Sequence, residues 1–213
     1  MKGNMVVFDV DGTLFDTKGG IIKTLNFILA EAGMDVIEKT KEDSFIGPPI
    51  KESLITHFDL SEEMAYQLTK RYREVYVSRF IGESAMYNHA IMLLKKLREN
   101  GCILGVATLK TKTQVEKLLG IYALGEYFDI VAAASESGNV KKTDMLKQIR
   151  LKYINEVRKF YMIGDTQGDW KAAVENEYEF IAADYGYGDI EALPCTHICS
   201  IDEVLSVMQQ GDR

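Results

Sequence analysis

The chain contains little cysteine, proline or tryptophan: 213 residues include three cysteines, three prolines and one tryptophan. Cys102, Cys195 and Cys199 form no CxxC pair. A sparse, odd set of this kind is typical of reduced thiols in a cytoplasmic protein and argues against a disulfide framework. Cys195 and Cys199 flank His197, but a structural zinc site needs four ligands, and the surrounding sequence supplies no fourth.

Long apolar runs and an excess of basic residues are also missing. No run approaches the roughly 18 residues of a membrane span, and the opening MKGNMVVFDV is too short and turns acidic too soon to predict a signal peptide. With 25 Lys and Arg against 32 Asp and Glu, the formal net charge is -7. We therefore expect no nucleic-acid polymer and no membrane as partner. We expect a cytoplasmic protein that is a monomer or a weak homodimer.

Apolar runs of strand length recur along the chain and are nearly continuous instead of alternating with polar residues. This pattern is typical of parallel strands that are covered on both faces. Helical patterns lie between the runs, so the sequence predicts an α/β fold with a doubly wound, Rossmann-like parallel sheet. The apolar runs are Met5–Phe8, Cys102–Ala107, Ile130–Ala134, Phe160–Ile163 and Phe180–Ala183, and the helical patterns cover 89–100, 111–120, 142–153 and 168–176.

More than 90 residues separate the first apolar run from the second, which breaks the alternation of strands and helices. Apolar spacing in this interval predicts amphipathic helices at 21–33 and 61–80, with no convincing strand between them. We therefore predict a small all-helical domain at 17–80, called the cap below. The α/β core is then formed by 1–16 and 81–213.

Two short motifs of the cap predict local features of the backbone. Pro48 and Pro49, in SFIGPPIKES, predict a rigid loop inside the cap. Gly19 and Gly20 stand where the chain enters the cap and predict a hinge there.

Polar and charged residues follow four of the predicted strands. Taken singly, each has an ordinary explanation as a turn residue, a helix cap or part of a solvated face. Together they are significant, because ligands of an open parallel sheet bind at the carboxyl ends of its strands. One functional explanation then covers residues that otherwise need separate ones. The residues are Asp9 and Asp11 after the first strand, Thr108 after the second, Lys141 and Lys142 after the third, and Asp165 and Asp169 after the fourth.

The chemistry that fits this set is phosphoryl transfer through an aspartyl-phosphate. Asp9 is predicted as the nucleophile, since a carboxylate can form a covalent intermediate. Asp11 is predicted as the general acid that protonates the leaving oxygen and then as the base that activates water. Gly12 allows the backbone to curl, so that both carboxylates project to one side. Thr108 is expected to donate a hydrogen bond to the transferring phosphoryl group.

A divalent cation is required by the charge of this site. The four aspartates bring four negative charges, and a phosphate monoester adds about two more. Mg²⁺, which prefers hard oxygen ligands, is the predicted cofactor, and one lysine adds a further positive charge at the phosphoryl group. That lysine is Lys142 or Lys141, and the sequence favours Lys142. The predicted metal set is Asp9, Asp11, Asp165 and Asp169, with Asp169 either ligating or orienting the others.

The DVDGTL motif at 9–14, the later Thr108 and lysine, and the GDxxxD pattern at 164–169 resemble the haloacid dehalogenase superfamily of hydrolases. Within it, the helical cap, FIGPPIKESL and DYGYGD are similar to the phosphoglycolate phosphatase and 5′-nucleotidase-like branch. The resemblance implies a catalytic core and a cap that closes over a small phosphorylated metabolite. An aspartate two residues after the nucleophile implies a phosphatase or phosphomutase. Leu109 departs from the family, whose members often have Asn or Ser there.

Several alternatives remain open at this point. A phosphomutase or a pyrophosphatase of the same superfamily would use the same core residues. A phospho-receiver signalling domain also combines acidic residues, a hydroxyl and a lysine, but it carries its phosphorylated aspartate after the third strand. A silent binding module would not need Asp9, Asp11 and Asp165 intact. No GxxxxGK[ST] run is present, which sets a P-loop ATPase aside.

Overall fold

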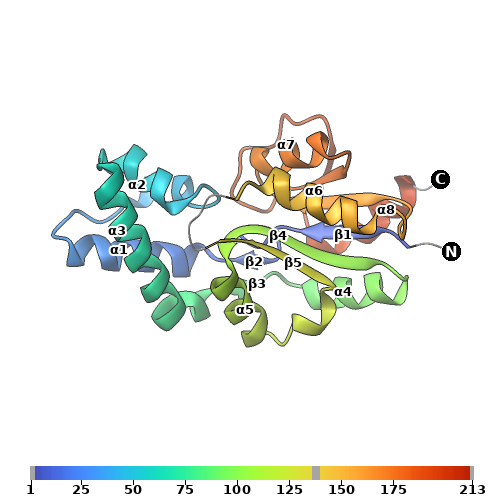
Figure 1. Cartoon of the computed structure of the whole chain (residues 1–213), viewed down its shortest axis with the longest axis horizontal. Helices are drawn as coiled ribbons and strands as arrows, with labels where there is room; N and C mark the ends of the chain where they lie inside the picture. Colours follow the sequence, from blue (N-terminus) through green and yellow to red (C-terminus); the bar gives the residue numbers. More distant parts are fainter. Residues whose placement is uncertain (1–2, 136–139, 212–213) are drawn as a thin grey trace.

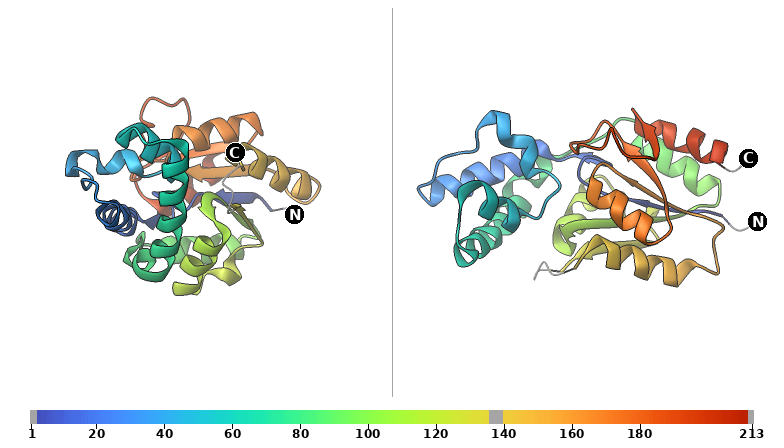
Figure 2. Two further views of the ribbon diagram at one scale, coloured as in Figure 1. Left: turned by 60° about the vertical axis from the view of Figure 1, so that its left-hand side comes forward. Right: turned by 90° about the horizontal axis from the view of Figure 1, so that it is seen from above.

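A computed structural model describes residues 3–135 and 140–211 of the chain. The core is a parallel sheet with helices on both faces, and a group of helices lies beyond the carboxyl ends of its strands (Figure 1). Figure 2 shows these helices, drawn in blue and teal, projecting from the core. Within the described residues, no helix has both the length and the apolar character that crossing a bilayer requires.

The sheet confirms the predicted fold class. Within the described residues it has six strands in the order β5-β4-β1-β6-β7-β8, and every neighbouring pair is parallel. The first strand lies at the centre, and its four residues are completely buried. The strands are β1 (Met5–Phe8), β4 (Ile103–Thr111), β5 (Ile130–Ala134), β6 (Phe160–Gly164), β7 (Glu179–Ala183) and β8 (Thr196–Ile198).

Alternate residues of β1 supply two different cores, one on each face of the sheet. Val6 and Phe8 belong to the core cluster that also contains residues of α4, α5 and α8. Met5 and Val7 belong to the cluster that contains residues of α6 and α7. A strand covered on both sides has no polar positions, which explains the unbroken apolar run. These helices are α4 (Ala90–Glu99), α5 (Lys112–Ile121), α6 (Lys142–Tyr153), α7 (Gln167–Glu175) and α8 (Val204–Gly211).

A short antiparallel ribbon joins the core to the inserted helices. Its strands are β2 (Phe15–Asp16) and β3 (Ala85–Met86), and Phe15 pairs with Met86. Strands of two residues carry no periodicity, so the sequence did not predict them. The cap range 17–80 stays a prediction, and the ribbon shows where the chain leaves the core and returns to it. Between the two strands lie α1 (Lys18–Glu31), a 3₁₀ helix (Lys39–Phe45), α2 (Ile50–Phe58), α3 (Glu62–Val75), a π-helical turn (Tyr76–Phe80) and a 3₁₀ turn (Ile81–Glu83).

The second core strand is longer than its apolar run. β4 begins at Ile103 and continues past Ala107 to Thr111, with an irregularity in its pairing to β5 between Thr108 and Thr111. The apolar pattern detects only the buried interior of the strand, whereas backbone pairing extends it through polar residues. Thr108 therefore lies inside β4, and the prediction that the strand ends there was wrong.

The region around Pro49 is not only a loop. Pro49 is the N-cap of α2, and the helix begins at Ile50. A proline at this point leaves no helical hydrogen bond unmade, because the first N–H groups of a helix have no partner within it.

The two glycines predicted as a hinge are part of a helix. Gly19 and Gly20 lie in the first turn of α1. A Cβ atom at Gly20 would lie 2.6 Å from the carbonyl oxygen of Phe80. Gly20 therefore allows close packing between two cap segments, and the hinge at this pair stays a prediction.

Candidate active site

The site begins where β1 ends at the centre of the sheet. The backbone N–H of Asp9 donates to the carbonyl of Ile163 at 2.9 Å, so β1 and β6 stay paired up to this residue. The Asp9 side chain is 7% exposed. Because β4 and β6 flank β1, residues that follow the three strands meet at one edge.

The turn after Asp9 depends on Gly12. Its φ angle is +69°, in the left-handed region that favours glycine. A Cβ atom at Gly12 would lie 2.0 Å from Oδ2 of Asp165. The predicted curl of the backbone is therefore present, and it also makes room for a carboxylate from another strand.

Three of the four predicted aspartates form one cluster. Asp9, Asp165 and Asp169 are buried, and each offers a carboxylate oxygen within 4.8 Å of the oxygens of the other two. Opposite oxygens on one Mg²⁺ would lie about 4.2 Å apart, since each stands about 2.1 Å from the metal. The donor set is all oxygen and nearly of the right size, so the residues fit this cation.

Burial and mutual repulsion raise the pKa values of Asp9 and Asp165. Burial, followed by the charges of Asp9 and Asp169, raises the pKa of Asp165 to about 8, although the Tyr187 N–H and Lys142 oppose the rise. Burial also raises the pKa of Asp9, which Lys142 opposes and Asp169 reinforces. Buried carboxylates of this kind are stabilised in their ionised form by a divalent cation.

Lys142 lies beside the predicted nucleophile. It is the first residue of α6, and its Nζ atom is 2.9 Å from Oδ1 of Asp9 and also donates to Oδ1 of Asp169. Burial by itself lowers the pKa of Lys142, but the two carboxylates outweigh it, so the pKa lies above the usual lysine range. The neighbouring Lys141 is the exposed N-cap of α6. The structure thus brings Lys142, and not Lys141, to Asp9.

Both oxygens of the Asp169 carboxylate have partners within the protein. Oδ1 accepts from Lys142, and Oδ2 accepts from the Thr166 N–H at 3.1 Å and from the Thr166 hydroxyl at 2.7 Å. Thr166 and Asp169 form the capping box of α7. These contacts favour the orienting role among the two that were predicted for Asp169.

The DYGYGD loop, to which the sequence assigned no role in the site, covers Asp165. The N–H of Tyr187 donates to Asp165 Oδ2 at 2.9 Å, and a Cβ atom at Gly186 would lie 2.2 Å from the Cβ of Asp165. The tyrosine hydroxyl also donates to Asp16, at the entrance to the cap. The glycines of DYGYGD were the sequence signal for this close approach.

The carboxylate of Asp11 lies outside the cluster of three. Its Oδ1 atom accepts from the Thr17 hydroxyl and lies 2.9 Å from Nζ of Lys110. Its role as a metal ligand stays a prediction, without support from these side-chain contacts. Thr17 and Lys110 were both missed, although a lysine inside the apolar ILGVATLKT segment is an unusual signal.

Thr108 lies one strand away from Asp9 at the same edge. It is 1% exposed and pairs in register with Ala133 of β5. Its hydroxyl oxygen accepts a hydrogen bond from the N–H of Lys110 at 3.2 Å. This bond leaves the hydroxyl proton available to a ligand, in keeping with the predicted role.

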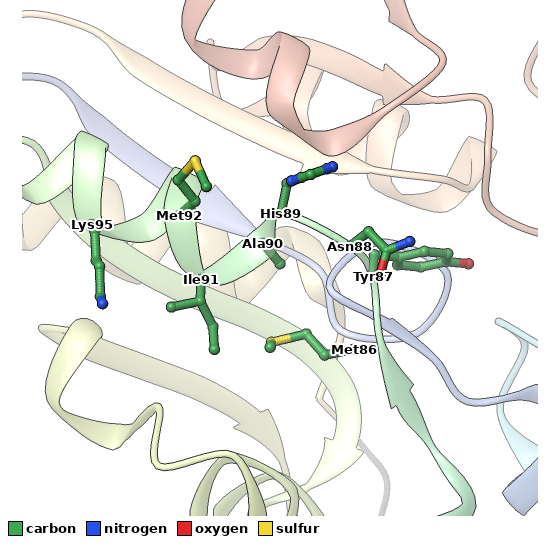
Figure 3. Close-up of a pocket in the computed structure, with 8 residues that line it drawn as sticks. All are labelled: Met86, Tyr87, Asn88, His89, Ala90, Ile91, Met92 and Lys95. Atoms are coloured by element: carbon green, nitrogen blue, oxygen red, sulfur yellow. The ribbon is translucent and has the colours of Figure 1, made fainter.

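A surface hollow of about 450 Å³ lies apart from these residues, along the segment that joins β3 to α4 (Figure 3). None of the predicted site residues lines it, and it carries no acidic side chain. We therefore assign the chemistry to the carboxyl edge of the sheet and not to this hollow. Its lining residues are Met86, Tyr87, Asn88, His89, Ala90, Ile91, Met92 and Lys95.

The fold and the side chains together define an α/β protein with an acidic cluster at the carboxyl edge of its sheet and a helical insert after the first strand. The family model of the haloacid dehalogenase-like hydrolases matches residues 6–183. The chain belongs to this family.

Relatives of the chain carry different activities in their names. It is 28% identical to the tyrosine-protein kinase PtkA of Mycobacterium tuberculosis, over 94% of this chain and 70% of that protein. It is 27% identical to a 5′-nucleotidase of Pseudomonas aeruginosa, over 92% and 90%. The crystal structure of a predicted phosphatase from Clostridium acetobutylicum superposes with a TM-score of 0.88 at 27% identity, over 99% of both chains.

Proposed function

We propose that the protein is a Mg²⁺-dependent phosphatase that hydrolyses a small phosphate monoester through an aspartyl-phosphate at Asp9. One observation carries the proposal. A buried carboxylate at the end of the central strand shares its surroundings with two further carboxylates and with a lysine 2.9 Å away. Lys142 favours the ionised form of Asp9 against the burial that raises its pKa, and the two further carboxylates form a site for a cation beside this nucleophile.

The metal would be held by Asp9 and Asp165, with Asp169 orienting the set. Mg²⁺ bound there would neutralise charge on the phosphoryl oxygens during transfer. The protein contributes the charge of Lys142 and the Thr108 hydroxyl, which would bind the remaining phosphoryl oxygens.

In the first half of the reaction, an Asp9 oxygen attacks phosphorus while the bond to the ester oxygen breaks. Asp11 gives its proton to the departing oxygen, so that an alcohol leaves. In the second half, Asp11 takes a proton from water, which attacks phosphorus and breaks its bond to Asp9. Inorganic phosphate is released, and both aspartates return to their starting states.

The substrate is expected to be phosphoglycolate-like or a nucleotide, in line with the sequence resemblance and with a relative named 5′-nucleotidase. A phosphomutase and a pyrophosphatase remain alternatives, because Asp9 and Asp11 would act in the same way in both. A phospho-receiver domain is less compatible, since its aspartate would follow the third strand along the chain. We place the enzyme in the cytoplasm, where its thiols stay reduced.

A phosphate-release screen tests the proposal. Purified protein is incubated with phosphoglycolate, nucleoside monophosphates, pyrophosphate and sugar phosphates, with Mg²⁺ or with a chelator, and Asp9→Asn is the blank. We expect many phosphates per chain, only with Mg²⁺ and only with Asp9. Full activity of Asp9→Asn, or a single phosphate retained per chain, would contradict the proposal.

One relative is named a tyrosine-protein kinase, so the screen needs a further arm. A nucleoside triphosphate is supplied with a tyrosine-containing peptide. Phosphopeptide formation in this arm, without release from monoesters, would replace the phosphatase with a transferase.

A further inference from the structure

Lys110 is a buried cation that the mechanism above does not use. It lies near the carboxyl end of β4, two residues after Thr108, and its side chain is 5% exposed. A charged lysine is rarely buried without a specific partner, so its placement calls for a reason.

Its partners come from both parts of the molecule. Nζ of Lys110 lies 2.9 Å from Oδ1 of Asp11 in the core. It also donates to the Tyr76 hydroxyl at 3.3 Å and lies 4.6 Å from the centre of that ring. Tyr76 is completely buried in the π-helical turn of the cap, and its hydroxyl is 3.1 Å from the hydroxyl of Ser84. The lysine therefore connects the cap to the predicted general acid.

The two carboxylate oxygens of Asp11 differ in their contacts. Within the described residues, the contacts of this carboxylate with Lys110 and with the Thr17 hydroxyl both fall on Oδ1. Lysine and threonine act here as donors, so Oδ1 is held as an acceptor. A proton on Asp11 would then be carried by Oδ2.

We propose that Lys110 is a positioning residue, which holds Asp11 by Oδ1 so that Oδ2 presents its proton to the leaving-group oxygen. This inference rests on the proposed function. The bond from phosphorus to the ester oxygen breaks as the bond to Asp9 forms, and the proton of Asp11 moves to the departing oxygen. Lys110 gives up no proton and touches no reacting atom. Tyr76 in turn holds Lys110 in place. The position of the cap therefore affects the orientation of the Asp11 carboxylate.

A purely structural lysine would behave differently in one respect. Protonation of the leaving oxygen matters for an alkyl ester, which would otherwise expel an alkoxide. It matters little for p-nitrophenyl phosphate, whose leaving group departs as a stable phenolate. Loss of positioning therefore lowers kcat/KM for the first ester more than for the second. Loss of general structure lowers both alike.

The test compares Lys110→Met with the unchanged protein on ethyl phosphate and p-nitrophenyl phosphate. We expect kcat/KM for ethyl phosphate to fall about 10²-fold or more, the range of general acid catalysis, and the value for p-nitrophenyl phosphate to fall less than about 5-fold. Asp11→Asn should show the same selectivity, and Lys110→Arg should restore part of the loss. Lys112→Met, at an exposed lysine that pairs with Glu116 of the same helix, should leave both values unchanged.

Equal losses on the two esters, or no loss on either, would overturn the role of Lys110. If Lys110→Met does not fold, as judged by circular dichroism, Tyr76→Phe decides, because it removes only the hydroxyl that holds the lysine. It should give a smaller loss with the same preference for ethyl phosphate, and a loss without that preference overturns the proposal. The proposed function fails separately, if Asp9→Asn keeps its activity on p-nitrophenyl phosphate.

Discussion

The Nζ atom of Lys142 lies 2.9 Å from Oδ1 of Asp9, inside a site where both side chains are at most 10% exposed. The lysine begins α6 and the aspartate directly follows β1, so the fold, and not the local sequence, brings them together. A fixed cation beside the nucleophile favours the ionised carboxylate against the burial that raises its pKa, and it attracts an anionic substrate in a protein of net charge -7.

This relationship predicts different effects for two adjacent lysines. Lys142→Met removes the cation from Asp9 and Asp169, and we expect kcat to fall about 10²-fold to 10³-fold, as when one stabilising donor is lost. Lys141→Met is the matched control, because Lys141 is exposed. Steady-state kinetics of the two variants check the prediction. Equal activities of the two variants would show that the contact between Lys142 and Asp9 has no part in catalysis.

Gly12 and Gly33 provide a second matched pair. Their φ angles are +69° and +70°, so alanine at either should cost about 1–2 kcal/mol of stability through backbone strain. Only at Gly12 would the new Cβ atom meet Asp165, at 2.0 Å, whereas Gly33 has open space. We expect Gly12→Ala to lose Mg²⁺ binding and activity, and Gly33→Ala to keep both. Isothermal titration with Mg²⁺ separates them, and equal affinities would contradict the geometry.

The stability of the metal-free protein should depend on pH. Asp165 has a pKa of about 8 in the folded protein, against 3.8 for an ordinary aspartate. Between these values the folded protein holds more protons than the unfolded chain. Its free energy of unfolding therefore decreases as pH rises through this window, and levels off above it.

Mg²⁺ should oppose this loss, because it binds the ionised carboxylates. We expect added Mg²⁺ to raise Tm more at about pH 8 than at about pH 5.5, where protons compete for the same oxygens. Asp165→Asn should remove most of both effects. Thermal unfolding with Mg²⁺ or with a chelator measures them, and a Mg²⁺ response independent of pH and of Asp165 would argue against this site.

Much of the site could be predicted because its residues follow strands. Apolar runs identify β1, β5, β6 and β7, and a parallel sheet must bring their carboxyl ends to one edge. Asp9 and Asp165 could be assigned to one cluster on this ground alone. The distance between them depends on the turn at Gly12. The conformation of that turn cannot be predicted from the residues around it alone.

Lys110 and Tyr187 were missed because their roles depend on contacts between distant segments. Lys110 matters through Tyr76, and Tyr187 through Asp165 and Asp16. Local periodicity also fails for β2 and β3, which have two residues each, and for β8, which has three. Such short strands are stabilised by their neighbours, so the sequence of the strand itself contains little evidence of them.

The covalent step at Asp9 is tested most directly by trapping the phosphorylated enzyme. Asp11→Asn is mixed with p-nitrophenyl phosphate and Mg²⁺, since this ester should not need the acid to form the intermediate, whereas hydrolysis should be slow without the base. After acid quenching and proteolysis, mass spectrometry should find one phosphoryl group on Asp9. It should find none in the double variant that carries both Asp9→Asn and Asp11→Asn. Nitrophenol release without a phosphoryl group on Asp9, or with one on another residue, would contradict the account.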